Sequence, residues 1–331
     1  MCSDKKTNPN TTGSWDSEKE SEALQEWVRK HRPGSTKSTY TTYQKQYVKY
    51  CYENKIPVEN QRDPVTIAKF LKDQFETRGL SRSTLTVVMP AAIADLSRYE
   101  KSKPTLSDIV KEVKKTIVRL TKPGKGKAPL PRHLLVRMTD MVSRTEPELK
   151  MVRDIFMFIL MFGGFMRQSE VTALKKEDVW IGEEEGSEGP CVYIFIEKSK
   201  TDQERTGETI VLQAGNTRSK LCPVTWYKIY EALKEKDTVN FFYSVVKGHK
   251  KLSAGRPNNL LKDFLKEMGL EEKEREAYGS HSLRKGGATR AASAKIRTHV
   301  IKRHGRWRSD AVYIYIVDPV GARLQVSKAV L

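Results

Sequence analysis

The chain has 331 residues, with 60 Lys and Arg against 41 Asp and Glu, which gives a formal net charge of +19 at pH 7. This length predicts two domains, and a hydrophobic content of 38% supplies packed cores and excludes global disorder. The excess of positive charge favours an acidic polymer as partner, with nucleic acid ahead of a membrane.

Three sequence features bear on the compartment. The longest apolar run, residues 155–166, is shorter than the roughly 20 residues of a membrane span, so a buried helix and no membrane partner are expected. The polar N-terminus has no apolar signal core, so we expect no secretion. The four cysteines are far apart and form no CxxC pair, which indicates neither a disulfide scaffold nor a metal site: Cys2, Cys51, Cys191 and Cys222. An intracellular protein is expected, nuclear if the host is eukaryotic.

The N-terminal third predicts helices. Residues 1–16 are polar without periodicity and are expected to be a disordered tail. Residues 17–121 then predict an all-helical domain. Within it, Asp63 is expected as an N-cap before Pro64 and Gly79 as the stop of the same helix. A further helix over 81–100 is expected to kink at Pro90.

A break in composition follows at 122–132, which is rich in Pro, Gly and basic residues and predicts an exposed basic linker. The second domain is expected over 133–331. It opens with helices, and alternating patterns at 192–196 and 208–212 then predict the two strands of a hairpin. Helices return from Pro223 onward. The fold class is therefore mainly α with a small β-sheet or hairpin, a helical domain followed by a mixed α/β domain.

Several short motifs carry residue types suited to phosphate chemistry. Arg167 and Glu170 are three apart, typical of a helix-face ion pair or of an arginine held by a carboxylate to grip a phosphate oxygen. Lys198 and Lys200 lie where the first strand turns, where a lysine is usually solvated but can donate a proton. His281 is followed by Arg284 at helical spacing, so their side chains leave one side of a helix.

Two aromatic positions and a basic stretch complete the set. Trp307 lies in a turn after Gly305, where a tryptophan most often packs. Tyr313 and Tyr315 are two apart on different sides of a helix, and a tyrosine can be a covalent nucleophile. No Asp or Glu occurs from 281 to 309, a stretch that predicts a phosphate-contacting surface with these residues: Lys285, Arg290, Lys302, Arg303, Arg306 and Arg308.

Taken in order, these motifs resemble the tyrosine recombinase, or phage integrase, family. The family pattern of Arg, hairpin Lys, His-x-x-Arg, His or Trp, and Tyr is matched from about residue 20 to the end of the chain by Arg167, Lys200, His281, Arg284, Trp307 and Tyr315. The wording HSLRKGGAT, HGRW and SDAVYIYI is most similar to recombinases of eukaryotic mobile elements of the crypton and DIRS-like groups.

The resemblance implies a helical core-binding domain and a catalytic domain that together close around double-stranded DNA. It implies a 3′-phosphotyrosine intermediate on Tyr315 that needs no cofactor and no metal. Arg167 and Arg284 would hold the phosphate, His281 would take the phenol proton, Lys200 would protonate the leaving oxygen, and Trp307 would support the pocket. Glu170 would orient Arg167. A homo-oligomer on DNA, from dimer to tetramer, is also implied.

Several alternatives stay open. Trp307 and Tyr315 are one position closer than in many bacterial members, so Tyr313 is a rival nucleophile. Lys198 competes with Lys200, and His304 lies near the slot that Trp307 fills. A type IB topoisomerase would use the same chemistry, and a catalytically silent DNA-binding protein derived from a recombinase would use none. An RNA-binding helical scaffold lacks any supporting motif.

Overall fold

The computed structural model describes residues 24, 27–28, 34–96, 102–124, 126–142, 146–197, 207–216, 219–246, 248–318 and 320–331. The chain divides into two compact units, Met1–Lys125 and Gly126–Leu331. The expected tail at 1–16 lies outside the described residues.

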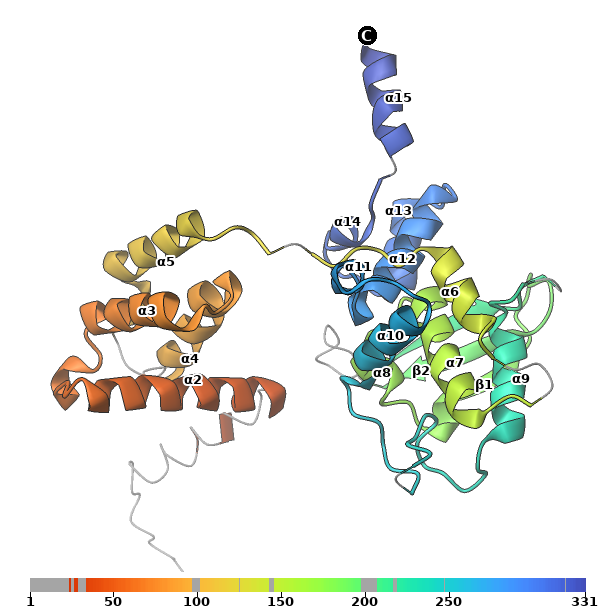
Figure 1. Cartoon of the computed structure of the whole chain (residues 1–331), viewed down its shortest axis with the longest axis horizontal. Helices are drawn as coiled ribbons and strands as arrows, with labels where there is room; N and C mark the ends of the chain where they lie inside the picture. The colour runs from red at the N-terminus through yellow and green to blue at the C-terminus, as the bar shows by residue number, and fades with distance from the viewer. Residues whose placement is uncertain are drawn as a thin grey trace, which may run out of the picture. The chain divides into compact units, whose positions relative to one another are not determined.

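The described part of the first unit is helical (Figure 1). Its helices are α2 (Gly34–Glu53), α3 (Pro64–Arg78), α4 (Met89–Leu96) and α5 (Asp108–Leu120), with short turns at Val58–Asn60, Thr84–Val88 and Pro104–Leu106. The predicted caps of α3 are confirmed, since the Asp63 carboxylate accepts a hydrogen bond from the Val65 N–H at 2.6 Å and Gly79 has φ +57°. The expected break near Pro90 is a π-helical turn that ends directly before α4.

Aromatic and aliphatic side chains from all four helices form the core of this unit. Tyr47 of α2 packs edge-on against Phe70 of α3, with ring centroids 5.0 Å apart. Val110 and Ile117 of α5 are buried in the same cluster. Each helix therefore contributes one apolar face, and the burial of these faces stabilises the unit.

The second unit surrounds α7 (Leu149–Gly163), whose residues 152–162 are all buried. A three-stranded antiparallel sheet of order β1-β2-β3 packs against α9 (Pro223–Leu233), and both belong to the same hydrophobic core as α7. The strands are β1 (Val179–Gly182), β2 (Cys191–Ile196) and β3 (Glu208–Gln213), and Ile194 pairs with Val179 on one side and Ile210 on the other. The predicted hairpin strands are confirmed, and β1 is an additional edge strand.

The remaining helices of this unit carry the later motifs. They are α6 (Arg132–Thr139), α8 (Gln168–Val171), α10 (Arg256–Glu267), α11 (Glu272–Glu276), α12 (Ser280–Ser293), α13 (Thr298–His304), α14 (Val312–Tyr315) and α15 (Val320–Val330). Figure 1 shows α12, α13 and α14 grouped together. Leu324, Val326 and Val330 of α15 are exposed. Within the described ranges, no helix is long and apolar enough to cross a membrane.

Within the described residues of 122–132, the stretch expected as an exposed linker is exposed at both ends but not at 128–131. Ala128 N–H donates to the Ala277 carbonyl and Leu130 N–H to the Ser282 carbonyl, each at 2.8 Å. Leu130 is buried in the main core of the second unit. The prediction of exposure was therefore wrong for residues 128–130, because these backbone bonds and one leucine attach them to the loop and helix around α12.

Helix α12 approaches α7 closely through two glycines. A Cβ at Gly287 would collide with the carbonyl oxygen of Phe162, and one at Gly286 would collide with that of Leu130. Both obstacles are backbone atoms, which cannot rotate away. The Gly286-Gly287 pair therefore sets the distance between α12, which carries Arg284, and the end of α7.

We expect Gly287→Ala to lower the free energy of unfolding by about 1–3 kcal/mol, the usual cost of overpacking a core. Gly255→Ala is the matched control, since a Cβ at Gly255 meets nothing within 4 Å and its φ is −82°. The control should cost about 1 kcal/mol or less. Urea unfolding measures both, and equal effects would contradict the close contact.

Candidate active site

The loop after α7 is held by three side chains from distant parts of the chain. The backbone carbonyls of residues 163, 164 and 165 form hydrogen bonds with the side chains of His304, Arg306 and Arg284, in that order. His304 Nε2 lies 2.7 Å from the first oxygen and Arg306 Nη1 lies 3.2 Å from the second. Arg284 Nη1 donates to the third. This loop leads directly into Arg167, so these hydrogen bonds fix the position of the Arg167 backbone.

Glu170 is the buried carboxylate of the site. Its Oε1 accepts from Arg167 Nη1 at 2.5 Å, and its Oε2 accepts from the Arg167 backbone N–H at 2.8 Å and from Arg306 Nη2 at 2.7 Å. The Glu170 and Arg306 side chains are each 2% exposed. Burial alone would raise the pKa of Glu170, but the charge of Arg306 and the bonds and charge of Arg167 together hold it below its usual value.

Arg284 lies deeper still and is fully buried. Its Nη2 donates to the Gly305 carbonyl at 2.6 Å, and its guanidinium carbon lies 4.3 Å from the Trp307 ring centroid and 5.4 Å from that of Tyr315. Desolvation, with a smaller contribution from the charge of Arg167, lowers the pKa of Arg284 to about 9. The Arg284 guanidinium thus has a strong preference for a nearby anion.

Charge balance in this cluster is incomplete. Among the described residues, the Glu170 carboxylate is ion-paired with Arg167 and Arg306, and the charge of Glu208 also acts on Arg306, so two carboxylates face three guanidinium groups. The Nε atoms of Arg284 and Arg306 are buried without a hydrogen-bond partner in the same set of residues. An arrangement of this kind suits the binding of an anion with several oxygens, such as a phosphate.

Tyr315 closes the cluster from α14. Its ring centroid lies 5.0 Å from that of Trp307 and 6.5 Å from that of His281. Thr289 of α12 fixes the local backbone by donating to the Tyr315 carbonyl at 3.1 Å and accepting from the Val317 N–H at 3.2 Å. Tyr315 is half-buried and packs against the buried Trp307.

Tyr313, the rival left open by the sequence, lies differently. It is 64% exposed, and its ring makes no aromatic or cation–π contact among the described residues, whereas that of Tyr315 makes three such contacts, with Arg284, His281 and Trp307. The geometry therefore favours Tyr315 over Tyr313. The two lysines expected on the hairpin, Lys198 and Lys200, lie outside the described residues.

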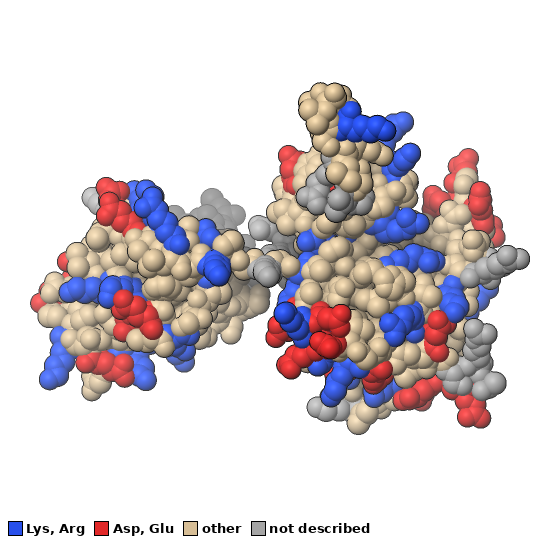
Figure 2. All heavy atoms as spheres, turned by 45° about the horizontal axis from the view of Figure 1, so that its top comes forward, with Lys and Arg blue, Asp and Glu red and all other residues tan. Residues whose placement is uncertain are grey.

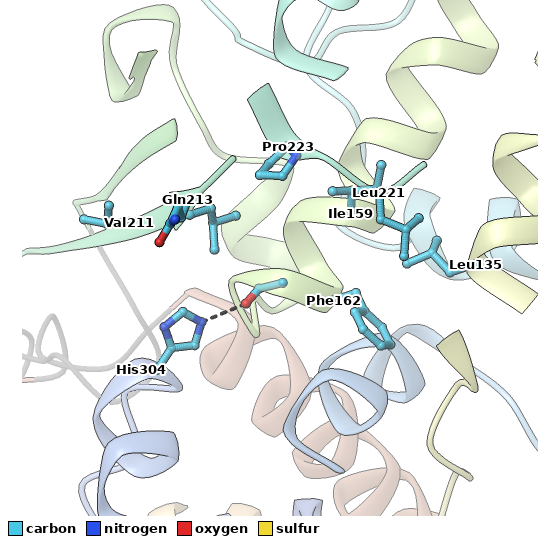
Figure 3. A pocket seen from close by; sticks show the side chains of 10 residues that line it. Leu135, Ile159, Phe162, Val211, Gln213, Leu221, Pro223 and His304 are labelled. Atoms are coloured by element: carbon cyan, nitrogen blue, oxygen red, sulfur yellow. Dashed lines mark hydrogen bonds between the residues drawn. The ribbon is translucent and has the colours of Figure 1, made fainter. Parts of the chain in front are cut away.

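His304 is occupied away from this cluster. Figure 3 shows its ring turned toward the Gly163 carbonyl at the edge of an apolar pocket of about 290 Å³. The ring also packs edge-on against Phe165, with centroids 4.7 Å apart, and burial lowers the pKa of His304. His304 therefore supports the 163–167 loop, and Trp307 fills the position beside Tyr315.

The expected phosphate-contacting surface is only partly open. Figure 2 shows Lys and Arg in scattered patches on the visible face of both units, with Asp and Glu among them. Arg290, Arg303 and Arg308 are exposed. Lys285 donates to the Lys127 carbonyl at 3.1 Å, and Lys302 pairs with Asp310 at 3.0 Å.

Arg306 was expected on the phosphate-contacting surface, and this prediction was wrong because its side chain is buried. It is buried because the turn at 305–307 takes a left-handed backbone at this position, φ +57°, which directs the side chain to Glu170. Sequence spacing carries no signal for such a backbone. No cluster of three or more His, Cys, Asp or Glu that could hold a metal occurs in the described ranges.

We expect Glu170→Gln to lower the free energy of unfolding by about 3–5 kcal/mol at pH 7, because it leaves two arginines without their buried counter-charge. The folded-state pKa of Glu170 is depressed, so its contribution is present above the unfolded pKa of about 4.3 and is lost as pH falls through the folded-state pKa. The difference between native and variant should therefore shrink in acid.

Urea unfolding between pH 3 and pH 8 measures this difference. Exposed Glu267 on α10 provides the control, and Glu267→Gln should stay within about 0.5 kcal/mol of native. A Glu170→Gln effect that is the same at every pH would show that its carboxylate charge does not hold the site.

No family model matches the chain. A curated relative, "Integrase/recombinase xerD homolog" from Selenomonas ruminantium, is 27% identical over 197 residues, which cover 58% of this chain and 54% of the relative. The chain thus spans about half the length of that relative.

Solved structures with the same fold cover more of the chain. The Tn1549 transposon integrase in complex with a circular intermediate DNA has a TM-score of 0.59, with 13% identity and coverage of 93% of this chain and 97% of that one. A lambda integrase dimer bound to a COC′ core site has a TM-score of 0.57 at 14% identity, with coverage of 90% of this chain and 76% of that one. XerH recombinase bound to difH substrate has a TM-score of 0.57 at 18% identity, with coverage of 87% of this chain and 78% of that one. These similarities show that the chain has the fold that these integrases and recombinases share.

Proposed function

We propose that this protein is a site-specific DNA recombinase that cuts and rejoins strands through a 3′-phosphotyrosine on Tyr315. The observation that carries the proposal is the packing of the Tyr315 ring against Arg284, Trp307 and His281. A tyrosine beside buried, under-compensated arginines is suited to attack a phosphodiester, since the arginines stabilise the charge that develops.

In the proposed reaction, the Tyr315 phenol oxygen attacks the scissile phosphorus and the bond to the 5′-oxygen breaks. His281 accepts the phenol proton, and Lys200, by resemblance, protonates the departing 5′-oxygen, which leaves as a hydroxyl. Arg167 and Arg284 bind the non-bridging oxygens. Attack by the 5′-hydroxyl of another strand reverses the step and releases Tyr315. The bond energy stays in the protein–DNA link throughout.

The proposed partner is double-stranded DNA, bound by the helical first unit and the catalytic second unit on either side of 122–132. The DNA present in the similar integrase and XerH structures supports this partner. A homo-oligomer on DNA, from dimer to tetramer, is also proposed, in line with the lambda integrase dimer on its core site. We further propose a role in mobile-element integration or excision, of the crypton or DIRS-like kind, in the nucleus of a eukaryotic host.

Covalent trapping tests the proposed reaction. The protein is incubated with nicked suicide duplexes that carry candidate element ends, denatured and digested, and the adduct is mapped by mass spectrometry. We expect an adduct on Tyr315 that is absent in Tyr315→Phe, while Tyr313→Phe retains it. An adduct on Tyr313 would refute the nucleophile, and intact DNA binding without any adduct would favour a silent DNA-binding protein. Relaxation of supercoils without two-site products would favour a topoisomerase.

The affinity for DNA should depend steeply on salt, because Lys and Arg contacts to phosphates release condensed counterions. Arg303→Ala removes one exposed cation from α13 and should lower the slope of log K against log salt by about 1. Fluorescence anisotropy on a duplex at several salt concentrations measures the slope. Arg137→Ala on α6 is the comparison, and equal slopes for the two variants would contradict a DNA contact at Arg303.

A further inference from the structure

Arg306 combines an unfavourable backbone with a buried charge. Its φ is +57°, a region that residues other than glycine seldom adopt because it strains the backbone. Its side chain is 2% exposed. Neither property is expected of an arginine on a solvated surface. The surrounding contacts must therefore hold the Arg306 backbone and side chain in this conformation.

The contacts of Arg306 lie on both sides of Arg167 in the sequence. One terminal nitrogen donates to the Gly164 carbonyl at 3.2 Å, and the other donates to Glu170 Oε2 at 2.7 Å. The same Oε2 accepts the Arg167 backbone N–H, which leaves Oε1 for the Arg167 guanidinium. Arg306 thus connects the start of the loop to the carboxylate that orients Arg167.

The neighbouring turn is shaped to place Arg306 here. A Cβ at Gly305 would collide with the Trp307 indole, so the glycine lets that ring fold back over the turn. The Gly305 carbonyl accepts from Arg284, and His304 holds the Gly163 carbonyl. Residues 304–307 therefore form one rigid turn laid against 163–165, with the Arg306 guanidinium at its centre.

We propose that Arg306 is a positioning residue of the strand-cleavage reaction, one that fixes the Glu170 carboxylate and through it the guanidinium of Arg167. The inference rests on the proposed function. A fork of two N–H groups is needed to reach Gly164 and Glu170 together, and a lysine ammonium has no such fixed geometry. Arg306 therefore acts on Arg167 without itself needing to touch the phosphate.

The test measures single-turnover cleavage of a nicked suicide duplex at saturating protein, with DNA affinity measured separately. Arg306→Gly suits the left-handed backbone and removes the guanidinium. We expect the cleavage rate to fall about 10²-fold, as for other lost electrostatic supports, while Kd for DNA changes less than about threefold. Arg306→Lys should recover only part of the rate. Arg137→Gln, at an exposed site on α6, should cleave as the native protein does.

Epistasis with Glu170 separates positioning from general destabilisation. If Arg306 acts through Glu170, the double variant Glu170→Gln/Arg306→Gly cleaves no more slowly than Glu170→Gln alone. Millimolar guanidinium should also raise the rate of Arg306→Gly, whereas sodium chloride at the same ionic strength should not. Should Arg306→Gly fail to fold by circular dichroism, Arg306→Lys carries the test, with at least a roughly tenfold loss expected at unchanged Kd.

Two results would overturn the inference while the proposed function stands: a native adduct on Tyr315 with an unchanged rate in the folded Arg306 variants, or multiplicative losses in the double variant. A fall in DNA affinity that accounts for the whole effect would likewise show that Arg306 is a DNA contact. Absence of any adduct in the native protein would instead remove the proposed function, and the inference with it.

Discussion

The site depends on one buried carboxylate. Glu170 accepts from Arg167 and Arg306 with both oxygens, and it does so at 2% exposure, where an unpaired charge is very costly. The buried Arg306 and the partly buried Arg167 can lie this close together because this carboxylate lies between them. Their mutual arrangement in turn determines where an incoming phosphate would meet Arg167. Removing the Glu170 carboxylate would disturb both the charge and the geometry of the site. A buried ion pair often adds little to the stability of a fold, so the burial of this one is better evidence of a binding site.

The fold brings this cluster together from three separate segments. The buried helix α7 ends at the 163–167 loop. Arg284 of α12 donates to a carbonyl of that loop, and the turn at 304–307 packs against it. Close packing is essential, since two adjacent glycines of α12 contact backbone carbonyls directly. The small sheet lies against the same α7 core. A rigid scaffold of this kind suits electrostatic catalysis, which requires groups already oriented before the reaction.

Local signals in the sequence predicted much of the fold. The caps of α3 and the two hairpin strands follow from Asp63, Gly79 and alternation. Strand β1 was missed because four residues ending in Gly182 carry no alternation, and only pairing with β2 makes them a strand. The burial of Arg306 was unpredictable because a left-handed backbone at a non-glycine residue leaves no pattern. The sequence favoured Tyr315 with Tyr313 as its rival, and the ring contacts of Tyr315 favour the same residue.

In the proposed reaction, Arg284 and its neighbours act on the negative charge of a phosphate that Tyr315 attacks. Cleavage of a duplex with a neutral methylphosphonate at the scissile position tests this role, with native protein and Arg284→Ala compared. We predict that the cleavage rate of Arg284→Ala falls about 10²-fold or more on the phosphate substrate and only a few-fold on the neutral one. An equal loss on both substrates would contradict it, because Arg284 would then support the fold rather than the charge.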